Sequence, residues 1–326
     1  MICINNSNTD PYFNLASEEY MLENFTEDCF MLWINKPALI VGRNQNTLSE
    51  INIDYAKKEN LCVVRRLSGG GATFHDLGNL NFTFIANNQL SDFTNFKKFA
   101  QPIIDVLQNL SVNAEFSGRN DLTIEGKKFS GNAQCKYKNK ILHHGSLLFS
   151  CDLQHLNNAL NVDPAKFQDK SVKSVSSRVT NISDYLKSPL YISDFSEIIM
   201  QHILETNTEC KLYKFNDYDI KKINELAQNK YSTWEWNFGK SPKYNLKKKK
   251  KYKFGLVEFN LDVKNGVINN AKFFGDFFGK YDISHIETAL IGVNHTPEDI
   301  RKVLSSFNIN DYFSNISIDD LLEGLF

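Results

Sequence analysis

The residues of this sequence that are best suited to chemistry form a glycine-rich stretch next to two arginines. Residues 65–76 read RRLSGGGATFHD. Glycines lack side chains that would obstruct a ligand and can adopt positive φ, so their backbone N–H groups can point at an anion. Because the arginines add fixed positive charge, the stretch predicts a phosphate-binding cradle. The alternative is a glycine-rich hairpin turn without a ligand.

The stretch differs from the two commonest nucleotide-binding motifs. No G-K-[ST] follows it, which excludes a Walker A loop. Residues 79–85 read NLNFTFI, which predicts a strand, whereas the dinucleotide-binding motif opens a helix. A phosphate at this loop would therefore be bound within another architecture.

A second cluster combines a lysine with small residues and an aspartate. Residues 118–122 read GRNDL and residues 126–134 read GKKFSGNAQ. Small neighbours let a substrate approach a lysine ammonium, and Asp121 offers a hard oxygen ligand for Mg²⁺ that bridges phosphates. An ordinary solvated turn is the alternative for both segments.

Two adjacent histidines open a third segment, HHGSLLF at 143–149, and the segment KSVSSRVTN follows at 173–181. Successive side chains of a strand point to opposite faces, so His143 and His144 cannot chelate one metal together. A metal centre is not expected here. One of the two can face a ligand, and the alternative is a hydrogen-bonded structural histidine.

The elements that would position these residues predict a mixed α+β domain over about 1–240. Residues 15–25 have the spacing of a first surface helix, and Ser193 can cap a later helix. Short apolar runs rich in β-branched and aromatic residues predict strands of one sheet. These runs are 30–34, 39–41, 61–64, 81–85 and 141–149.

The composition changes near residue 240. Residues 237–253 contain glycine, proline and the run Lys247–Lys251, which predicts an exposed loop at a domain boundary. Alternating apolar residues then predict a hairpin that turns at Asn265-Gly266, and Thr296 precedes a helix with proline at its first position. We therefore expect a domain at 1–244 and a small α+β domain at 245–326.

Bulk composition sets limits on the function. The 326 residues exceed the ~250–300 of a single core, and a net charge of −1 leaves attraction to a polyanion to local patches. The start lacks a basic segment followed by an apolar one, and no apolar run reaches the ~18–20 residues of a membrane span, so we expect a cytoplasmic protein. Six scattered cysteines without a C-x-x-C pair predict reduced thiols.

Taken together, these segments resemble the lipoate–protein ligases, which are related to the biotin–protein ligases and octanoyltransferases. The likeness rests on six segments in family order. They are RRLSGGGATFHD (65–76), GRND (118–121), GKKFSG (126–131), HHG (143–145), SVSSRV (174–179) and WEWNFG (234–239). The resemblance implies a mixed-sheet catalytic domain of the biotin/lipoate ligase type with a small accessory C-terminal domain.

The resemblance also implies a reaction. Lipoate would be activated by ATP, with Mg²⁺, to lipoyl-AMP, and the lipoyl group would pass to a lysine of a carrier protein. The implied carriers are lipoyl domains of 2-oxoacid dehydrogenase E2 subunits and the glycine cleavage H protein, with the enzyme a monomer. An apolar pocket separates near-isosteric tails poorly, so octanoate is expected to be a slower substrate.

The site residues that the resemblance implies fall into three groups with Lys128 in common. Lys128, rather than Lys127, matches the catalytic lysine of the family and would contact both substrates. The nucleotide would contact Arg66, Gly71, Ala72, Thr73, Phe74, Asn79, Asp121 and Lys128. Lipoate would contact Trp33, Gly70, Lys128, His144 and Gly145. Asp121 would also hold Mg²⁺.

Three other functions remain open. A carrier-to-carrier octanoyl- or lipoyltransferase would need a reactive thiol, for which Cys135 and Cys151 are the candidates. A biotin ligase would carry a Gly-Arg-Gly-Arg loop, which is absent. The run Lys247–Lys251 could bind nucleic acid, or it could steer an acidic carrier towards the site. Of these, we do not expect a nucleic-acid partner, and we expect no membrane partner.

Overall fold

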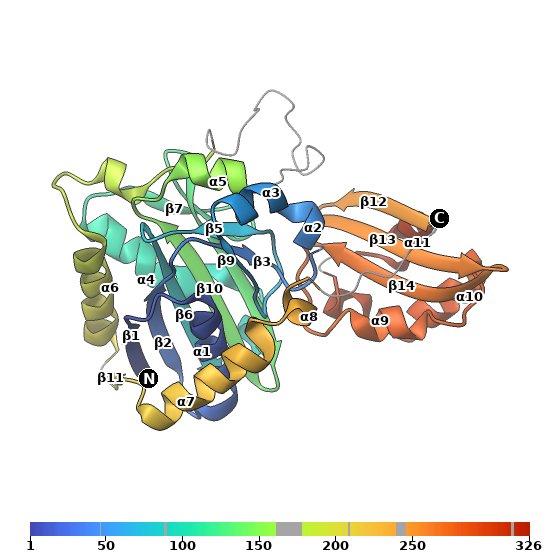
Figure 1. Cartoon of the computed structure of the whole chain (residues 1–326), viewed down its shortest axis with the longest axis horizontal. Helices are drawn as coiled ribbons and strands as arrows, with labels where there is room; N and C mark the ends of the chain where they lie inside the picture. Colours follow the sequence, from blue (N-terminus) through green and yellow to red (C-terminus); the bar gives the residue numbers. More distant parts are fainter. Residues whose placement is uncertain (46, 88–89, 161–177, 208, 239–245, 314–315) are drawn as a thin grey trace.

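The structure is a computed structural model, and it combines helices with a large mixed sheet and a smaller C-terminal sheet (Figure 1). It describes residues 1–45, 47–87, 90–160, 178–207, 209–238, 246–313 and 316–326. The expected α+β class is confirmed. In the described part of the chain, no helix has the length and apolar character needed to cross a bilayer.

The main sheet has eight strands in the order β11-β1-β2-β6-β10-β9-β8-β7. β1 pairs in parallel with β2 and β11, and the remaining neighbours are antiparallel. The strands are β1 (Ile2–Asn6), β2 (Cys29–Ile34), β6 (Asn79–Asn87), β7 (Ala114–Ser117), β8 (Asp121–Ile124), β9 (Lys127–Tyr137), β10 (Lys140–Leu148) and β11 (Lys211–Leu212). The predicted strands at 30–34, 81–85 and 141–149 therefore lie in this sheet.

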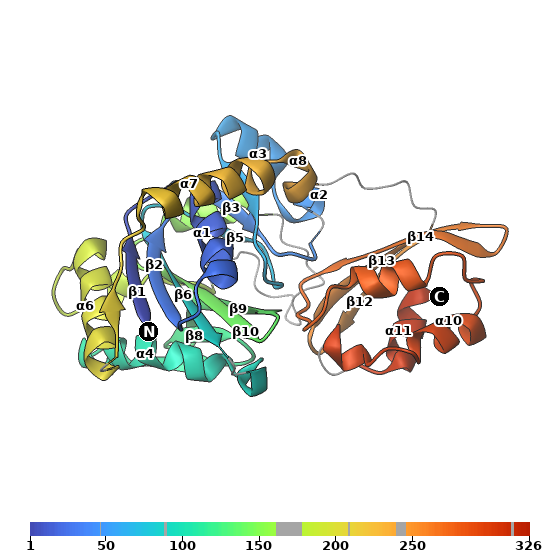
Figure 2. The same ribbon diagram turned by 90° about the horizontal axis from the view of Figure 1, so that it is seen from below.

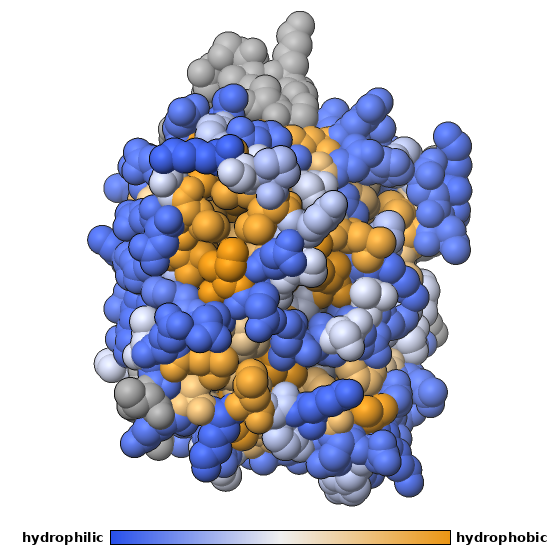
Figure 3. All heavy atoms as spheres, turned by 90° about the vertical axis from the view of Figure 1, so that its left-hand side faces the viewer, coloured by the Kyte–Doolittle hydropathy of each residue, from blue (hydrophilic) through white to orange (hydrophobic). Residues whose placement is uncertain are grey.

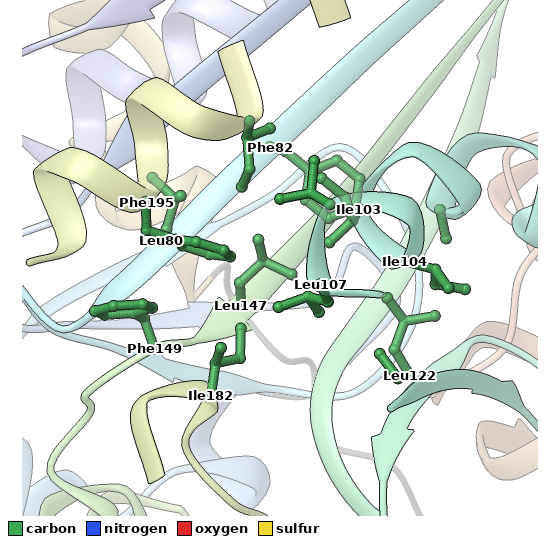
Figure 4. Packing of buried hydrophobic residues seen from close by; sticks show 14 of the residues in the cluster. Leu80, Phe82, Ile103, Ile104, Leu107, Leu122, Leu147, Phe149, Ile182 and Phe195 are labelled. Carbon is green, nitrogen blue, oxygen red and sulfur yellow. The ribbon is translucent and has the colours of Figure 1, made fainter. Parts of the chain in front are cut away.

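Helices cover both faces of the main sheet (Figure 2). On one face, α4 (Phe96–Asn109) and α6 (Ile192–Thr206) bury a core that includes Phe82, Leu107 and Phe195 (Figure 4). On the other face lies α1 (Pro11–Asn24), which begins after its N-cap Asp10. A helix at this place was predicted, but as a surface helix.

The first helix is buried because a second layer covers it. α7 (Asp217–Leu226) and the π-helical turn η4 (Ala227–Tyr231) pack on the side of α1 that faces away from the sheet. Ten of the residues of α1 are buried, including Glu18. Sequence periodicity did not reveal this cover, because α7 follows about 190 residues later.

A separate three-stranded sheet carries the glycine-rich stretch. Its order is β4-β3-β5, with β3 (Ala38–Val41), β4 (Cys62–Arg65) and β5 (Thr73–His75). The prediction that 39–41 and 61–64 share a sheet with 30–34 and 81–85 was therefore wrong. β3 and β4 are parallel, and the short helices α2 (Thr47–Glu50) and α3 (Ile53–Lys58) make the crossover between them.

Smaller elements complete the larger part of the chain. They are η1 (Leu90–Asp92), α5 (Leu153–Ala159), η3 (Ile182–Tyr185) and α8 (Trp234–Asn237). The predicted N-cap Ser193 was wrong, because α6 already begins at Ile192 and Ser193 lies inside its first turn. Figure 3 shows the end of the molecule that lies on the left of Figure 1, where apolar patches are bordered by hydrophilic residues.

The C-terminal sheet, β12-β13-β14, packs against short helices. The elements are β12 (Leu246–Tyr252), β13 (Gly255–Lys264), β14 (Val267–Gly275), α9 (Ser284–Ala289), α10 (Pro297–Leu304), η5 (Ile309–Asp311) and α11 (Ile318–Leu325). The predicted hairpin turn is confirmed, with φ of 51° at Asn265 and 77° at Gly266. Thr296 caps α10 as expected. The predicted boundary at 244/245 lies outside the described residues.

The lysine run is a strand rather than the expected loop. Lys247–Lys251 belong to β12, the edge strand that pairs with β13. Lys248 donates a hydrogen bond to the carbonyl oxygen of Glu323, and Lys250 forms an ion pair with the Glu323 carboxylate. Alternate lysines of the run therefore face α11, while the others lie on the opposite face of the sheet.

The two parts of the chain touch next to the glycine-rich stretch. Arg119 donates a hydrogen bond to the carbonyl oxygen of Phe254, and its guanidinium lies 4.7 Å from the ring centre of Phe278. Phe278 is 4% exposed and packs in a cluster with Phe96 and Ala133. The C-terminal part thus inserts an aromatic side chain beside the predicted site.

Candidate active site

The glycine-rich stretch forms a loop between β4 and β5 that Arg66 holds in shape. The Arg66 guanidinium is 6% exposed and donates to the carbonyl oxygens of Gly69 and Gly71 at 2.7 and 2.8 Å. Burial lowers the pKa of Arg66 to about 10. Arg66 therefore contributes positive charge to the site while its donors build the loop.

Two neighbouring glycines of the loop have different surroundings. Gly70 has a φ of +90°, and a Cβ there would lie 2.9 Å from Arg66 Nη2 and 3.2 Å from the Phe278 ring. A Cβ at Gly71 would meet no described atom within 4 Å. Gly70 is thus required by backbone conformation and packing, whereas Gly71 borders open space.

Arg65 stabilises the structure around the end of β4 through its hydrogen bonds. Its guanidinium donates to carbonyl oxygens of five residues and to one hydroxyl. The acceptors are Gly42 O, Arg43 O, Gln45 O, Trp236 O, Asn237 O and Thr47 Oγ1. Burial lowers its pKa to about 10. Arg65 therefore ties α8 to the end of β4, and α8 contains four of the six residues of the WEWNFG segment.

Lys128 stands near the start of β9, beside the first residue of β8. Its Nζ lies 2.7 Å from Oδ1 of Asp121, and the two side chains are 41% and 38% exposed. Its backbone is fixed as well, because Lys128 N–H donates to Arg178 O at 2.8 Å and Lys128 O accepts from Thr180 N–H at 2.9 Å. The segment that begins at Arg178 thus holds the lysine, while 174–177 of the SVSSRV segment lie outside the described residues.

Two cavities share a wall at Lys128. The smaller, of about 120 Å³, is lined by all five residues predicted to contact lipoate, Trp33, Gly70, Lys128, His144 and Gly145, and by Arg66. The larger, of about 710 Å³, is lined by Phe74, Asp121 and Lys128, and Gly71, Ala72 and Thr73 line both cavities. Lys127 lines only the larger cavity, whereas Lys128 lines both.

Asn79 stands apart from the other predicted site residues. It is fully buried at the start of β6 and donates to Oδ1 of Asn81 at 2.9 Å. It is not among the described residues that line either cavity. Its Oδ1 has no hydrogen-bond partner among the described residues.

The two histidines of β10 face opposite sides of the sheet, as predicted. His143 stacks on Phe99 with ring centres 5.0 Å apart, and burial holds its pKa well below the usual range. His144 lines the smaller cavity and lies within hydrogen-bond distance of Ser68 and Glu18. His143 is therefore structural, and His144 is placed to meet a ligand.

Comparison with known proteins agrees with this geometry. The lipoyl protein ligase A/B catalytic domain matches residues 10–204, and the bacterial lipoate protein ligase C-terminus matches 241–325. Lipoate–protein ligase 1 of Staphylococcus aureus is 47% identical over 320 residues, which are 98% of this chain and 97% of the relative. The chain belongs to the lipoate–protein ligase family.

Solved structures extend the match to the fold. LipL1 of P. falciparum, solved in complex with lipoate, has a TM-score of 0.79 at 27% identity and covers 99% of this chain and 98% of its own. A bi-partite lipoate protein ligase of Thermoplasma acidophilum has a TM-score of 0.62 at 26% identity, covering 75% of this chain and 98% of its own. The predicted family, enzyme class and fold are confirmed.

The thiols that a transferase of this fold would need are buried away from both cavities. Cys135 and Cys151 are 8% and 5% exposed, and neither lines the two cavities described above. Burial raises the pKa of Cys135 to about 12, and it holds the pKa of Cys151 well above the usual range. A thiolate is therefore disfavoured at both positions.

The larger cavity contains carboxylates from both parts of the ligase. Asp121 of β8 and Asp276, which follows β14, both line it. Among the described residues, no group of three or more histidine, cysteine, aspartate or glutamate side chains could hold a metal ion by itself. Mg²⁺ in proteins is commonly held by one or two carboxylates together with substrate phosphates, and these residues fit that pattern.

Sequence reasoning missed the buried side chains behind the smaller cavity, Glu18, Ser68 and Thr83. A signal for Glu18 exists, because Leu15, Glu18 and Leu22 lie on one face of α1 at the spacing i, i+3, i+7. A carboxylate between two buried leucines indicates a paired buried charge.

Proposed function

We propose that this ligase activates free lipoate with ATP and transfers the lipoyl group to a lysine of a carrier protein. The observation that carries the proposal is the position of Lys128, whose side chain borders both cavities. One ammonium can then serve an acyl group on one side and phosphates on the other. Activation is needed because a free carboxylic acid does not acylate an amine at neutral pH.

In the first step, a lipoate carboxylate oxygen attacks the α-phosphorus of ATP. A P–O bond to the α-phosphorus forms, the bond to the bridging oxygen breaks, and pyrophosphate leaves. Negative charge grows on the α-phosphate oxygens, and the Lys128 ammonium would stabilise it. Gly71, Ala72, Thr73 and Phe74, which line the larger cavity, would contact the nucleotide.

In the second step, the neutral amine of a carrier lysine attacks the acyl carbon of lipoyl-AMP. The C–N bond forms, the C–O bond to AMP breaks, and the amine loses a proton as AMP departs. Lys128 would hold the carbonyl oxygen as it becomes negatively charged. The same side chain is thus proposed to act in both steps.

The smaller cavity is proposed to hold the acyl chain. Trp33, Gly70, His144 and Gly145 line it, and its volume suits a slender chain rather than a nucleotide. The related LipL1 of P. falciparum binds lipoate, which supports this assignment. Asn79 remains a prediction for the adenine, although it is buried and is not among the described residues that line either cavity.

Mg²⁺ would be held by Asp121 with phosphate oxygens, and Asp276 is near enough to line the same cavity. When bound, the ion offsets phosphate charge. Asp121 also orients the Lys128 ammonium through their ion pair. The chain's own contribution is therefore an acidic side chain on β8 and a basic side chain on the neighbouring strand β9.

The proposed acceptors are lipoyl domains and the H protein. The T. acidophilum ligase was studied with its E2 lipoyl domain, which supports the first of these.

We also propose that the ligase is a monomer with domains at 1–244 and 245–326. Light scattering of the purified protein, alone and with a carrier, tests the monomer.

A single assay tests the proposed function. Purified protein is mixed with ATP, Mg²⁺, lipoate and an apo lipoyl domain, and the carrier is weighed by mass spectrometry. A lipoyl mass increment that requires ATP is expected. Modification without ATP from a lipoylated donor carrier would instead favour the transferase, and replacing Cys135 and Cys151 by serine would then abolish it.

A further inference from the structure

A buried carboxylate lies behind the proposed acyl pocket. Glu18 is 1% exposed, and its Oε1 lies 2.9 Å from His144 Nδ1 and 2.6 Å from Thr83 Oγ1. His144 lines the smaller cavity, whereas Glu18 and Thr83 are not among its described lining residues. A buried charge is strongly unfavourable unless it is hydrogen-bonded and balanced by an opposite charge.

A chain of hydrogen bonds connects Glu18 to Arg66. Ser68 Oγ lies 2.5 Å from His144 Nε2, and Arg66 Nε donates to Ser68 Oγ at 3.1 Å. An ionised carboxylate can only accept, so Nδ1–H of His144 donates to Glu18. With the proton on Nδ1, Nε2 accepts from the Ser68 hydroxyl. All three bonds run in one direction, from the guanidinium to the carboxylate.

Arg66 and Glu18 thereby balance each other's charge. Among the described residues, the Arg66 guanidinium donates hydrogen bonds to a hydroxyl and to carbonyl oxygens and to no carboxylate. The negative charge of Glu18 acts on Arg66 against the effect of burial. A fully buried cation and a fully buried anion are thus joined through Ser68 and His144.

A second branch of the network connects Glu18 to Trp33. Trp33 Nε1 donates to Thr83 Oγ1 at 2.9 Å, and the Thr83 hydroxyl donates to Glu18. Trp33 is on β2 and His144 is on β10, and both line the smaller cavity. One carboxylate therefore fixes two side chains that come from different strands.

The geometry points to Glu18 as a positioning residue of the acyl pocket, which orients His144 and Trp33 and balances the charge of Arg66 through Ser68. This inference rests on the proposed function, because it takes the smaller cavity as the acyl pocket. Arg66 also shapes the glycine-rich loop, so the network joins the acyl pocket to the loop that borders the larger cavity.

The full-length variant Glu18→Gln tests the inference, with Glu19→Gln as its matched control. Gln keeps the shape of Glu18 and removes its charge. Glu19, the next residue of α1, forms an ion pair with Lys230 at 2.7 Å and does not line the acyl pocket. We expect Glu18→Gln to raise KM for lipoate about tenfold or more, with a smaller change in kcat. The control should keep the KM of the wild type.

A second readout does not depend on catalysis. In ¹⁵N NMR spectra of the free protein, His144 should carry its proton on Nδ1 in the wild type and in Glu19→Gln. The Glu18→Gln variant should lose this preference. An unchanged KM together with an unchanged His144 tautomer would overturn the inference. Failure of the proposed function would give a different result from failure of this inference. The wild type would then make no lipoyl-AMP, while the difference in the His144 tautomer between the wild type and Glu18→Gln would remain.

A pair of milder variants covers the case in which Glu18→Gln does not fold. Thr83→Val keeps the volume and removes the link between Trp33 and Glu18, while Thr83→Ser keeps the hydroxyl. KM for lipoate should rise in the valine variant and return towards the wild-type value in the serine variant. Equal KM values in the two variants would contradict the positioning role, because a packing effect alone would not follow the hydroxyl.

Discussion

The Nζ of Lys128 lies 2.7 Å from Oδ1 of Asp121, so two residues assigned to different roles form one ion pair. Both side chains are more than a third exposed, and exposed ion pairs stabilise a fold by only about 0–1 kcal/mol. Stability therefore does not account for the arrangement. The pair holds the ammonium at the wall shared by the two cavities and keeps a carboxylate next to the proposed phosphates.

Replacing Lys128 by alanine should strongly slow both half-reactions and leave the fold intact. Preorganised charge stabilisation of this kind is worth about 3–4 kcal/mol, or roughly 10²–10³ in rate. Pyrophosphate release in the presence of lipoate measures the first step, and transfer from synthetic lipoyl-AMP measures the second. Lys127→Ala is the control and should keep most of its activity. Pyrophosphate release near the wild-type rate in Lys128→Ala would contradict the role given to this lysine.

The parts of the fold that were predicted from sequence are those with a local signal. Asn265-Gly266 turns the hairpin and Thr296 caps α10, because turn and cap chemistry acts within a few residues. Which sheet a strand joins is decided by distant chain segments. The run 39–41 therefore looked like the strands of the main sheet, although it pairs with β4 and β5.

The missed features share a physical reason. Lys247–Lys251 has no apolar alternation, so it looked like a loop, yet β13 supplies the pairing that makes it a strand. The spacing of Glu18 with Leu15 and Leu22 indicates that it is buried, but its partners Thr83 and His144 lie far along the chain. The groups that bind the buried carboxylate therefore become visible only when these segments meet. The site residues were proposed from the resemblance to the family rather than from such local patterns.

Replacing Gly131 by alanine should lower activity without destabilising the protein. A Cβ at Gly131 would lie 3.0 Å from Nζ and 3.1 Å from Cε of Lys128, so this flexible side chain must move. A displacement of about 1 Å can cost on the order of 100-fold in rate. We therefore expect lipoyl-AMP to form about tenfold to hundredfold more slowly. The midpoint of urea unfolding should not change. Unaltered adenylation in the alanine variant would mean that the ammonium position matters little.

Acid should destabilise the ligase through two buried neutral histidines. Burial lowers the pKa of His75 to about 3, and it holds that of His143 well below the usual range. In the unfolded chain both would bind protons below about pH 6.5, so the unfolded state gains protons as pH falls. The contribution of the two histidines to stability is therefore fully present above that pH. Below it, the free energy of unfolding should fall by up to about 1.4 kcal/mol per histidine for each pH unit.

Urea unfolding between pH 7.5 and pH 5 measures this effect. His143→Gln removes one of the two titrating groups and should make the decline with pH shallower, whatever its effect on stability at pH 7.5. His202→Gln is a suitable control, because this histidine lies on α6 and is partly exposed to solvent. The same slope in the His143 variant and the wild type would exclude His143 as a source of the acid sensitivity.

Replacing Phe278 by alanine should loosen the C-terminal part of the chain. The ring is 4% exposed, packs on Phe96 with ring centres 5.6 Å apart and lies below the Arg119 guanidinium. Truncation of a well-buried phenylalanine costs about 3–5 kcal/mol. Hydrogen exchange should therefore accelerate at Gly275, whose N–H donates to Asn44 O. Phe326→Ala, at an exposed end of the same domain, should leave exchange there unchanged. Equal protection in both variants would rule out Phe278 as the anchor.

Replacing Lys247, Lys249 and Lys251 by serine should slow association with an acidic carrier. Lys248 and Lys250 reach α11, so these three lysines lie on the other face of β12, at the edge of the sheet. Charge on such a surface acts mainly on the association rate and is screened by salt. Stopped-flow mixing with an apo lipoyl domain should give a slower rate with a weaker salt dependence. The variant Lys248→Ser with Lys250→Ser is the control and should change stability rather than association. If the triple variant associates at the wild-type rate over the whole salt range, the run has no steering role. Tight binding of the wild type to duplex DNA at physiological salt would instead indicate a nucleic-acid-binding role for the run.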